Sequence, residues 1–148
     1  MKFDKLVNQI LKESNTVSTE NYYQDLANYL SPTLTIGANK INPDSGIVNS
    51  NQKGIYYNNK QVGKIEVTIE GNKLTLENIR RFNDAKEIQG YRIGEKVLQQ
   101  IKAYALKHNL VISVEFANTG LEKTFNSIFK DWDISTEGNH TIAKKIQL

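Results

Sequence analysis

Apolar residues in the first part of the chain recur at helical spacing. From Phe3 to Leu11 they fall at i, i+3, i+4, i+7 and i+8, which predicts a short amphipathic helix. A second helix is expected from about Glu20 to Ser31, because Pro32 disfavours helical backbone in the residue before it. The next segment, "TLTIGANKI", is a candidate strand, and the polar, turn-rich "NPDSGIVNSNQ" is expected to form a loop.

The hydrophobic period changes from helical spacing to two at Gly54. From there to Phe82, apolar and polar side chains alternate, and the alternation is interrupted at Asn58-Asn59 and at Gly71-Asn72. Asn and Gly pairs at such interruptions favour tight hairpin turns. The segment is therefore predicted to form three antiparallel strands.

The rest of the chain alternates between helix and strand. A long amphipathic helix should end near His108. "LVISVEF" follows as a near-continuous apolar run, which is typical of a strand buried on both faces. A short helix is expected from Gly120 to Trp132, and the chain should close with a hairpin. Because the long helix is a crossover, the strands before and after it should be parallel.

This order predicts an α+β fold with a mixed, mostly antiparallel central sheet and flanking helices. We expect one domain over 1–148, with N-terminal helices and a loop in 1–51 and the remaining elements in 54–148.

Composition narrows the function classes. The formal charge of +3 is mild, and the dense basic cluster is limited to Arg80-Arg81 with Lys86 and Arg92 nearby, so no nucleic-acid partner is expected. With no cysteine and two histidines, no metal site is expected. No apolar run is long enough for a membrane span, and the start lacks the apolar core of a signal peptide, which favours a cytoplasmic protein.

Two glycines, Gly90 and Gly94, stand four residues apart where the long helix begins. A turn of this kind can aim the first backbone N–H groups of the helix at an anion, and the positive end of the helix dipole adds to the attraction. The alternative is a plain turn from strand to helix, with Gly94 allowing the helix to pack closely.

Two motifs in this order resemble the GNAT superfamily of N-acetyltransferases. The first is a pyrophosphate-binding turn: Gln89-Gly90-Tyr91-Arg92-Ile93-Gly94 fits it, except that Arg92 stands where the family has glycine. In the second, the buried strand is followed by Asn118 and a short helix, in which Phe125 stands where the family has a proton-donating Tyr. The resemblance covers about 54–148 and implies a parallel pair of strands that splits at the centre of the sheet.

The resemblance also implies a ligand. Residues 89–94 would hold the pyrophosphate of acetyl-CoA, and Asn118 would meet its pantetheine arm or, alternatively, cap the short helix. Arg92 either displaces the turn through its Cβ or supplies a cation to a phosphate. The paired Arg80-Arg81 could hold the coenzyme's phosphates or an acidic substrate; otherwise one is exposed and the other has a buried stem.

Glu77 and Glu115 are the candidate general bases. Glu77 lies on the last strand of the meander, and Glu115 interrupts the buried apolar run. The favoured alternative for Glu77 is a solvent-facing residue of an alternating strand. A charge at the position of Glu115 is costly unless it is paired or lies near an open cleft. Tyr104 and the Tyr22-Tyr23 pair are expected to serve packing.

The predicted function is transfer of an acetyl group from acetyl-CoA to an amine-bearing small molecule or protein acceptor, by direct attack in a ternary complex. The alternative is a non-catalytic GNAT-like binding or structural protein. Its start resembles the leader segments of some phage head proteins, which are clipped after a Glu, here Glu13. An exposed edge on the last strand could pair two copies into a homodimer.

Overall fold

The structure, a computed structural model, describes residues 17–40, 51–116 and 119–146. The predicted helix from Phe3 to Leu11, the segment around Glu13, most of the predicted loop and the candidate Asn118 lie outside the described residues.

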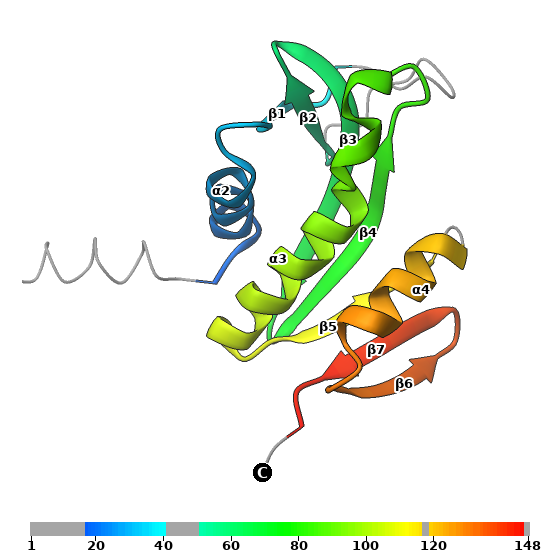
Figure 1. The fold of residues 1–148 in the computed structure, drawn as a ribbon. Helices are drawn as coiled ribbons and strands as arrows, with labels where there is room; N and C mark the ends of the chain where they lie inside the picture. The colour runs from blue at the N-terminus through cyan, green and yellow to red at the C-terminus, as the bar shows by residue number, and fades with distance from the viewer. Residues whose placement is uncertain (1–16, 41–50, 117–118, 147–148) are drawn as a thin grey trace, which may run out of the picture.

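The described residues form one seven-stranded sheet in the order β1-β2-β3-β4-β5-β7-β6 (Figure 1). Every neighbouring pair is antiparallel except β4 and β5, which are parallel. The predicted fold class, the three-stranded meander and the parallel pair are therefore confirmed. The strands are β1 (Thr35–Ala38), β2 (Lys53–Tyr57), β3 (Lys60–Glu70), β4 (Lys73–Arg81), β5 (Val111–Val114), β6 (Asp133–Glu137) and β7 (His140–Lys144).

Three α-helices and a short 3₁₀ helix accompany the sheet in the described residues: α2 (Thr19–Leu30), η1 (Lys86–Tyr91), α3 (Ile93–His108) and α4 (Thr119–Ile128). Helix α2 begins where the hydroxyl of Ser18 accepts a hydrogen bond from the N–H of Asn21 at 3.0 Å. It ends at Ser31, whose backbone is extended before Pro32, as expected. The 3₁₀ helix η1 was not predicted; it lies between β4 and α3, where the sequence indicated only a turn.

The meander turns and the core follow from the sequence pattern. Asn58 and Asn59 both have positive φ, 50° and 66°, which matches the twist of a tight two-residue hairpin. The three α-helices and the inner face of the sheet enclose one hydrophobic cluster. The aromatic residues within it are Tyr22, Tyr23, Phe82, Tyr104, Phe125, Phe129 and Trp132.

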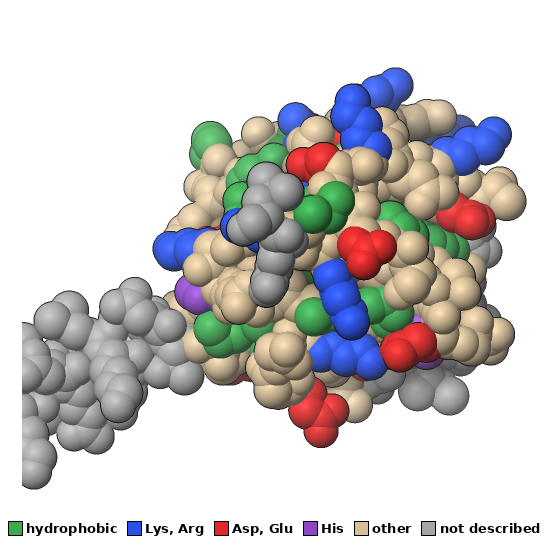
Figure 2. All heavy atoms as spheres, turned by 90° about the horizontal axis from the view of Figure 1, so that it is seen from below, with side chains coloured by type: hydrophobic (Ala, Val, Ile, Leu, Met, Phe, Trp, Pro, Cys, Tyr) green, Lys and Arg blue, Asp and Glu red, His purple; other side chains and the backbone are tan. Residues whose placement is uncertain are grey.

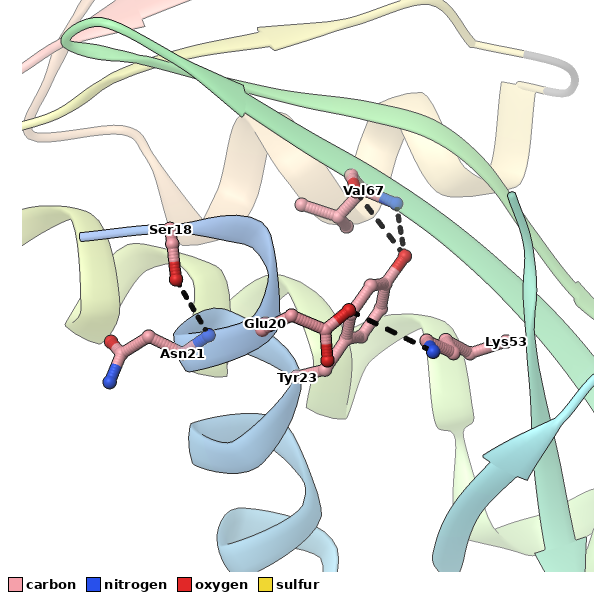
Figure 3. A network of polar contacts seen from close by, with 6 residues as sticks. All are labelled: Ser18, Glu20, Asn21, Tyr23, Lys53 and Val67. Carbon is pink, nitrogen blue, oxygen red and sulfur yellow. Dashed lines mark hydrogen bonds and ion pairs between the residues drawn. The ribbon is translucent and has the colours of Figure 1, made fainter. Parts of the chain in front are cut away.

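Helix α2 completes the hydrogen bonding of β3 beyond the part that pairs with β2. Strand β2 pairs with β3 only as far as Ile65. Beyond that residue, the hydroxyl of Tyr23 accepts from the N–H of Val67 at 2.8 Å and donates to its carbonyl at 3.3 Å (Figure 3). The hydroxyl of Thr19 accepts from the N–H of Ile69 at 3.2 Å. Two side chains of α2 thus satisfy backbone groups that an open strand edge would leave unpaired.

Strand β6 forms the other edge of the sheet, and all five of its residues are exposed. The hairpin of β6 and β7 confirms the predicted C-terminal strands, while pairing of two copies through this edge stays a prediction. None of the helices in the described residues is long and apolar enough to cross a membrane.

Candidate functional site

The parallel strands β4 and β5 form a fork. They pair only from Lys73 to Leu76 on β4 and from Val111 to Val114 on β5, while β4 runs on to Arg81. Beyond Leu76, the side of β4 that faced β5 has no strand beside it among the described residues. The predicted split of the central pair is therefore present, and it exposes backbone groups of β4 that a ligand could meet.

A β-bulge lies directly at this fork. On β3, Glu66 pairs with Asn78 and the next residue, Val67, pairs with Leu76, so Glu77 is an extra residue on β4. A bulged residue leaves the ladder locally unpaired and bends its strand. The bulge also explains why Leu76 and Ile79, three residues apart, both belong to the core face. The bulge therefore lies directly beyond Leu76, where the pairing of β4 with β5 stops.

A cavity of about 610 Å³ opens between the outer half of β4, the start of α3 and one face of α4. In Figure 1, α4 lies apart from the upper halves of β4 and α3. Its lining residues are Ile79, Arg80, Arg81, Gln89, Arg92, Ile93, Gly94, Glu95, Gly120, Leu121, Lys123, Thr124, Ser127 and Ile128.

The turn into α3 has its special backbone conformation at Arg92. This residue has φ 61° and ψ 59°, in the left-handed region that glycine adopts most easily. Arg92 therefore takes a glycine-like backbone conformation despite its Cβ. It is the N-cap of α3, and no side chain caps the helix there, so the first N–H groups of α3 have no capping side chain at the cavity.

The two glycines of this segment have different surroundings. Gly90 belongs to η1, and a Cβ built on it would have open space around it. A Cβ on Gly94 would approach Leu121 Cδ1 of α4 at 3.3 Å, which is a tight contact with a flexible side chain. Gly94 thus serves close packing of α3 on α4, which was the alternative interpretation, and it also lines the cavity.

Basic side chains dominate the charge of the cavity. Arg80, Arg81, Arg92 and Lys123 line it together with one acid, Glu95. The guanidinium of Arg92 pairs with Glu95 at 3.3 Å and is largely exposed. That of Arg81 donates to the carbonyls of Phe82 and Ala85, both at 3.2 Å, which ties β4 to η1. The excess of positive charge suits an anionic ligand.

Charged side chains are distributed differently at the other end of the molecule. A second cavity of about 650 Å³ lies there, lined by Trp132, Asp133, Lys144 and Lys145 among others. Viewed from below in Figure 2, basic and acidic side chains are interspersed on this end, with hydrophobic side chains between them. The cavity beside the fork is the one around which basic residues are concentrated.

The predicted coenzyme residues divide into two groups. Gln89, Arg92, Ile93 and Gly94 line the cavity. Gly90 and Tyr91 are not among its lining residues, and the ring of Tyr91 instead lies 5.7 Å from the ammonium of Lys96. The candidate Asn118 lies outside the described residues, and its role stays a prediction.

The two candidate bases stand beside the fork and outside the cavity lining. Glu77 follows Leu76, and Glu115 follows Val114, and these two apolar residues form the last pair before the strands separate. Both carboxylates are on exposed residues. The hydroxyl of Thr68 donates to Glu77 Oε1 at 3.2 Å, across the exposed face of β3 and β4.

Phe125 is fully buried and stacks on Phe129 with the ring centroids 4.5 Å apart. It therefore fills the core beneath α4 and does not face the cavity. Tyr104 and Tyr22 are packed edge to face at 5.2 Å, as expected for packing residues. Among the described residues, no group of three or more His, Cys, Asp or Glu side chains is arranged to hold a metal ion.

Sequence reasoning missed the α4 wall of the cavity, in particular Lys123 and Ser127. The sequence predicted the helix itself, but its polar residues gave no signal without knowledge of what α4 packs beside.

No protein-family model matches the chain, and no curated protein matches its sequence. Solved structures do match. Arabidopsis thaliana Naa50, in complex with the bisubstrate analogue CoA-Ac-MVNAL, is 14% identical, with a TM-score of 0.52 over 77% of this chain and 99% of that one. This chain has the GNAT fold. A GNAT family acetyltransferase from Elizabethkingia anophelis with acetyl-CoA bound is also 14% identical, with a TM-score of 0.47 over 79% of this chain and all of that one.

A third GNAT-fold neighbour is the PaiA N-acetyltransferase of Thermoplasma acidophilum, in complex with coenzyme A. It is 14% identical, with a TM-score of 0.44 over 97% of this chain and 79% of that one. At such identities the likeness concerns the path of the backbone. What the site of this GNAT-fold chain binds depends on its own residues.

Proposed function

We propose that this chain binds acetyl-CoA in the cavity beside the fork and transfers the acetyl group to an amine. One observation supports this most strongly: an α3 N-terminus without a side-chain cap, an excess of basic residues and a bulged, open strand all border the same hollow. The uncapped helix start and the basic residues suit phosphates, and the open strand suits an extended arm that carries amides. Coenzyme A combines these features in one ligand.

The turn at the start of α3 would hold the pyrophosphate. The N–H groups after Arg92 supply hydrogen-bond donors, and the helix dipole favours negative charge there. Arg92 adds an exposed cation on the lining of the cavity. Charge-assisted hydrogen bonds of this kind are worth about 1.5–3 kcal/mol each.

The outer half of β4 would hold the pantetheine arm and the thioester. Past Leu76 its backbone lacks a β5 partner, so its N–H and C=O groups can pair with the amides of the arm. An N–H of the bulge at Glu77 would point to the thioester carbonyl and stabilise the negative charge that develops on its oxygen.

Transfer would proceed by direct attack, since the chain contains no cysteine to hold an acyl group. The amine nitrogen forms a bond to the carbonyl carbon, the carbon–sulfur bond breaks, and the sulfur leaves with the electron pair. Glu77 or Glu115 would take the proton from the amine, directly or through a water molecule. Both residues directly follow the last paired residues of β4 and β5, which supports either of them as the base.

The test combines binding with turnover. Isothermal titration of the full chain with acetyl-CoA should give saturable binding, and mixtures with amine acceptors should release free thiol. Glu77→Gln and Glu115→Gln should leave binding intact, and the substitution that removes the base should lower turnover by about 10²–10⁴-fold. Glu70→Gln, on the exposed end of β3, is the matched control and should change neither. Absence of binding at millimolar coenzyme would refute the proposal.

A non-catalytic binding role is the second candidate, and the burial of Phe125 favours it. The position at which the family has a proton-donating Tyr holds a side chain without a proton to give, inside the core. Saturable coenzyme binding without thiol release over a broad panel of amines would support this second role.

A further inference from the structure

The wall of the cavity formed by α4 brings its own cation to the site. Gly120, Leu121, Lys123, Thr124, Ser127 and Ile128 all line the cavity and lie on one continuous face of α4. Lys123 is the basic residue among them and is exposed. It lines the cavity from α4, whereas Arg92 lines it from the start of α3.

Lys123 differs from the neighbouring Arg81 and Arg92 in the polar contacts that their side chains already make. Arg81 is bound to two carbonyls of the β4–η1 connection, and Arg92 is paired with Glu95. Elsewhere on this side of the molecule, Lys102 is held by the carbonyl of Ile128 and by Asp131, both at 2.7 Å. In the part of the chain that the structure describes, no ion pair involves Lys123. Its ammonium can therefore meet an anion without first breaking another contact.

We infer that Lys123 binds a second anionic group of the same ligand and makes the site selective for coenzymes with a phosphate on the ribose. This inference rests on the proposed function. The turn at α3 accounts for the pyrophosphate, and the remaining phosphate of coenzyme A is the 3′-phosphate of its adenosine. A compact ammonium on a flexible stem suits a terminal phosphate, which can be approached from several directions.

The experiment is a titration of four ligand–protein pairs: coenzyme A and dephospho-coenzyme A, each with the unmodified chain and with Lys123→Ala. The unmodified chain should bind coenzyme A about tenfold more tightly than dephospho-coenzyme A. Lys123→Ala should lose this preference while its affinity for dephospho-coenzyme A stays the same. Lys130→Ala, an exposed lysine just past α4 that does not line the cavity, should keep the preference. Thermal melts of each variant confirm that they are folded.

The possible failures are separable. Equal affinity of the unmodified chain for both ligands would overturn the role of Lys123 and leave the proposed function standing. An equal loss for both ligands in Lys123→Ala would also overturn it, because Lys123 would then contact a part that the two ligands share. No binding of either ligand to the unmodified chain would overturn the proposed function, and the inference with it.

Discussion

Replacing Arg92 tests the structural account of the turn, because its φ of 61° is costly for any residue with a Cβ. The left-handed conformation costs an L-residue about 1–2 kcal/mol. Arg92→Gly removes that cost, but glycine loses more chain entropy on folding, about 0.5–1 kcal/mol. The exposed pair with Glu95 is also lost, at about 0.2–1 kcal/mol. The net expectation is a free energy of unfolding within about 1 kcal/mol of the unmodified chain, in either direction.

A contrasting variant sharpens this test. Arg92→Val loses the same ion pair but places a β-branched side chain in the left-handed region, where such residues are rare outliers. We expect it to be less stable than Arg92→Gly by about 2 kcal/mol. A strain of up to about 3 kcal/mol at valine outweighs the chain entropy of about 0.5–1 kcal/mol that glycine loses on folding. Urea unfolding followed by circular dichroism measures both. If Arg92→Val were as stable as Arg92→Gly, the left-handed backbone conformation at position 92 would be contradicted.

The same position separates the two roles of the Arg92 side chain in binding. Because the turn already has a glycine-like conformation, Arg92→Ala and Arg92→Gly should weaken coenzyme A binding alike, by about tenfold or roughly 1.4 kcal/mol. Dephospho-coenzyme A should be affected equally, since the contact is with the pyrophosphate. Tighter binding by Arg92→Gly would show instead that the Arg92 side chain obstructs the site.

Three further predictions concern the frame that positions the fork. Tyr23→Phe leaves buried backbone groups of β3 without their partner, so urea unfolding should show a loss of about 1–3 kcal/mol; no loss would contradict the bridging role of its hydroxyl. A Cβ on Gly63 would lie 2.4 Å from the carbonyl oxygen of Arg80, so Gly63→Ala should destabilise the chain by about 1–3 kcal/mol. Gly90→Ala is the control: a Cβ there has open space around it, so this variant should be nearly neutral in the same assay. Burial raises the pKa of Tyr23 and of Tyr104 from 10.0 to about 12. The stability contributed by the neutral phenols is therefore complete below pH 10 and is lost as pH rises to about 12. Urea unfolding at pH 9 and pH 11, with phenolate absorbance, checks this, and equal stability at the two pH values would contradict it.

The sequence was sufficient to predict the sheet and its fork, because the deciding signals are local. The alternation after Gly54 and the two polar interruptions specify the meander, and the apolar run around Val111–Val114 specifies a central strand. The crossover helix between them then fixes their parallel orientation. These features depend on side-chain period and chain connection, which a single sequence displays.

The details of the site depend on packing between distant segments, which the sequence does not display. The bulge at Glu77 had a faint sign, since Ile79 follows Leu76 at a spacing of three where strict alternation requires two. The left-handed backbone of Arg92 had none, because arginine rarely adopts it. Lys123 became a candidate only when α4 was seen to form a wall of the cavity.

The central claim is that acetyl-CoA occupies the hollow between β4, α3 and α4. Amide ¹H–¹⁵N spectra of the full chain, recorded while acetyl-CoA is added, test it most directly. The account predicts saturating shifts that concentrate at the start of α3, from Ile93 to Glu95, and at Asn78 and Ile79 past the bulge, while β6 stays unchanged. Shifts confined to the opposite end, around Trp132 and Lys144, or no shifts at millimolar acetyl-CoA, would contradict it.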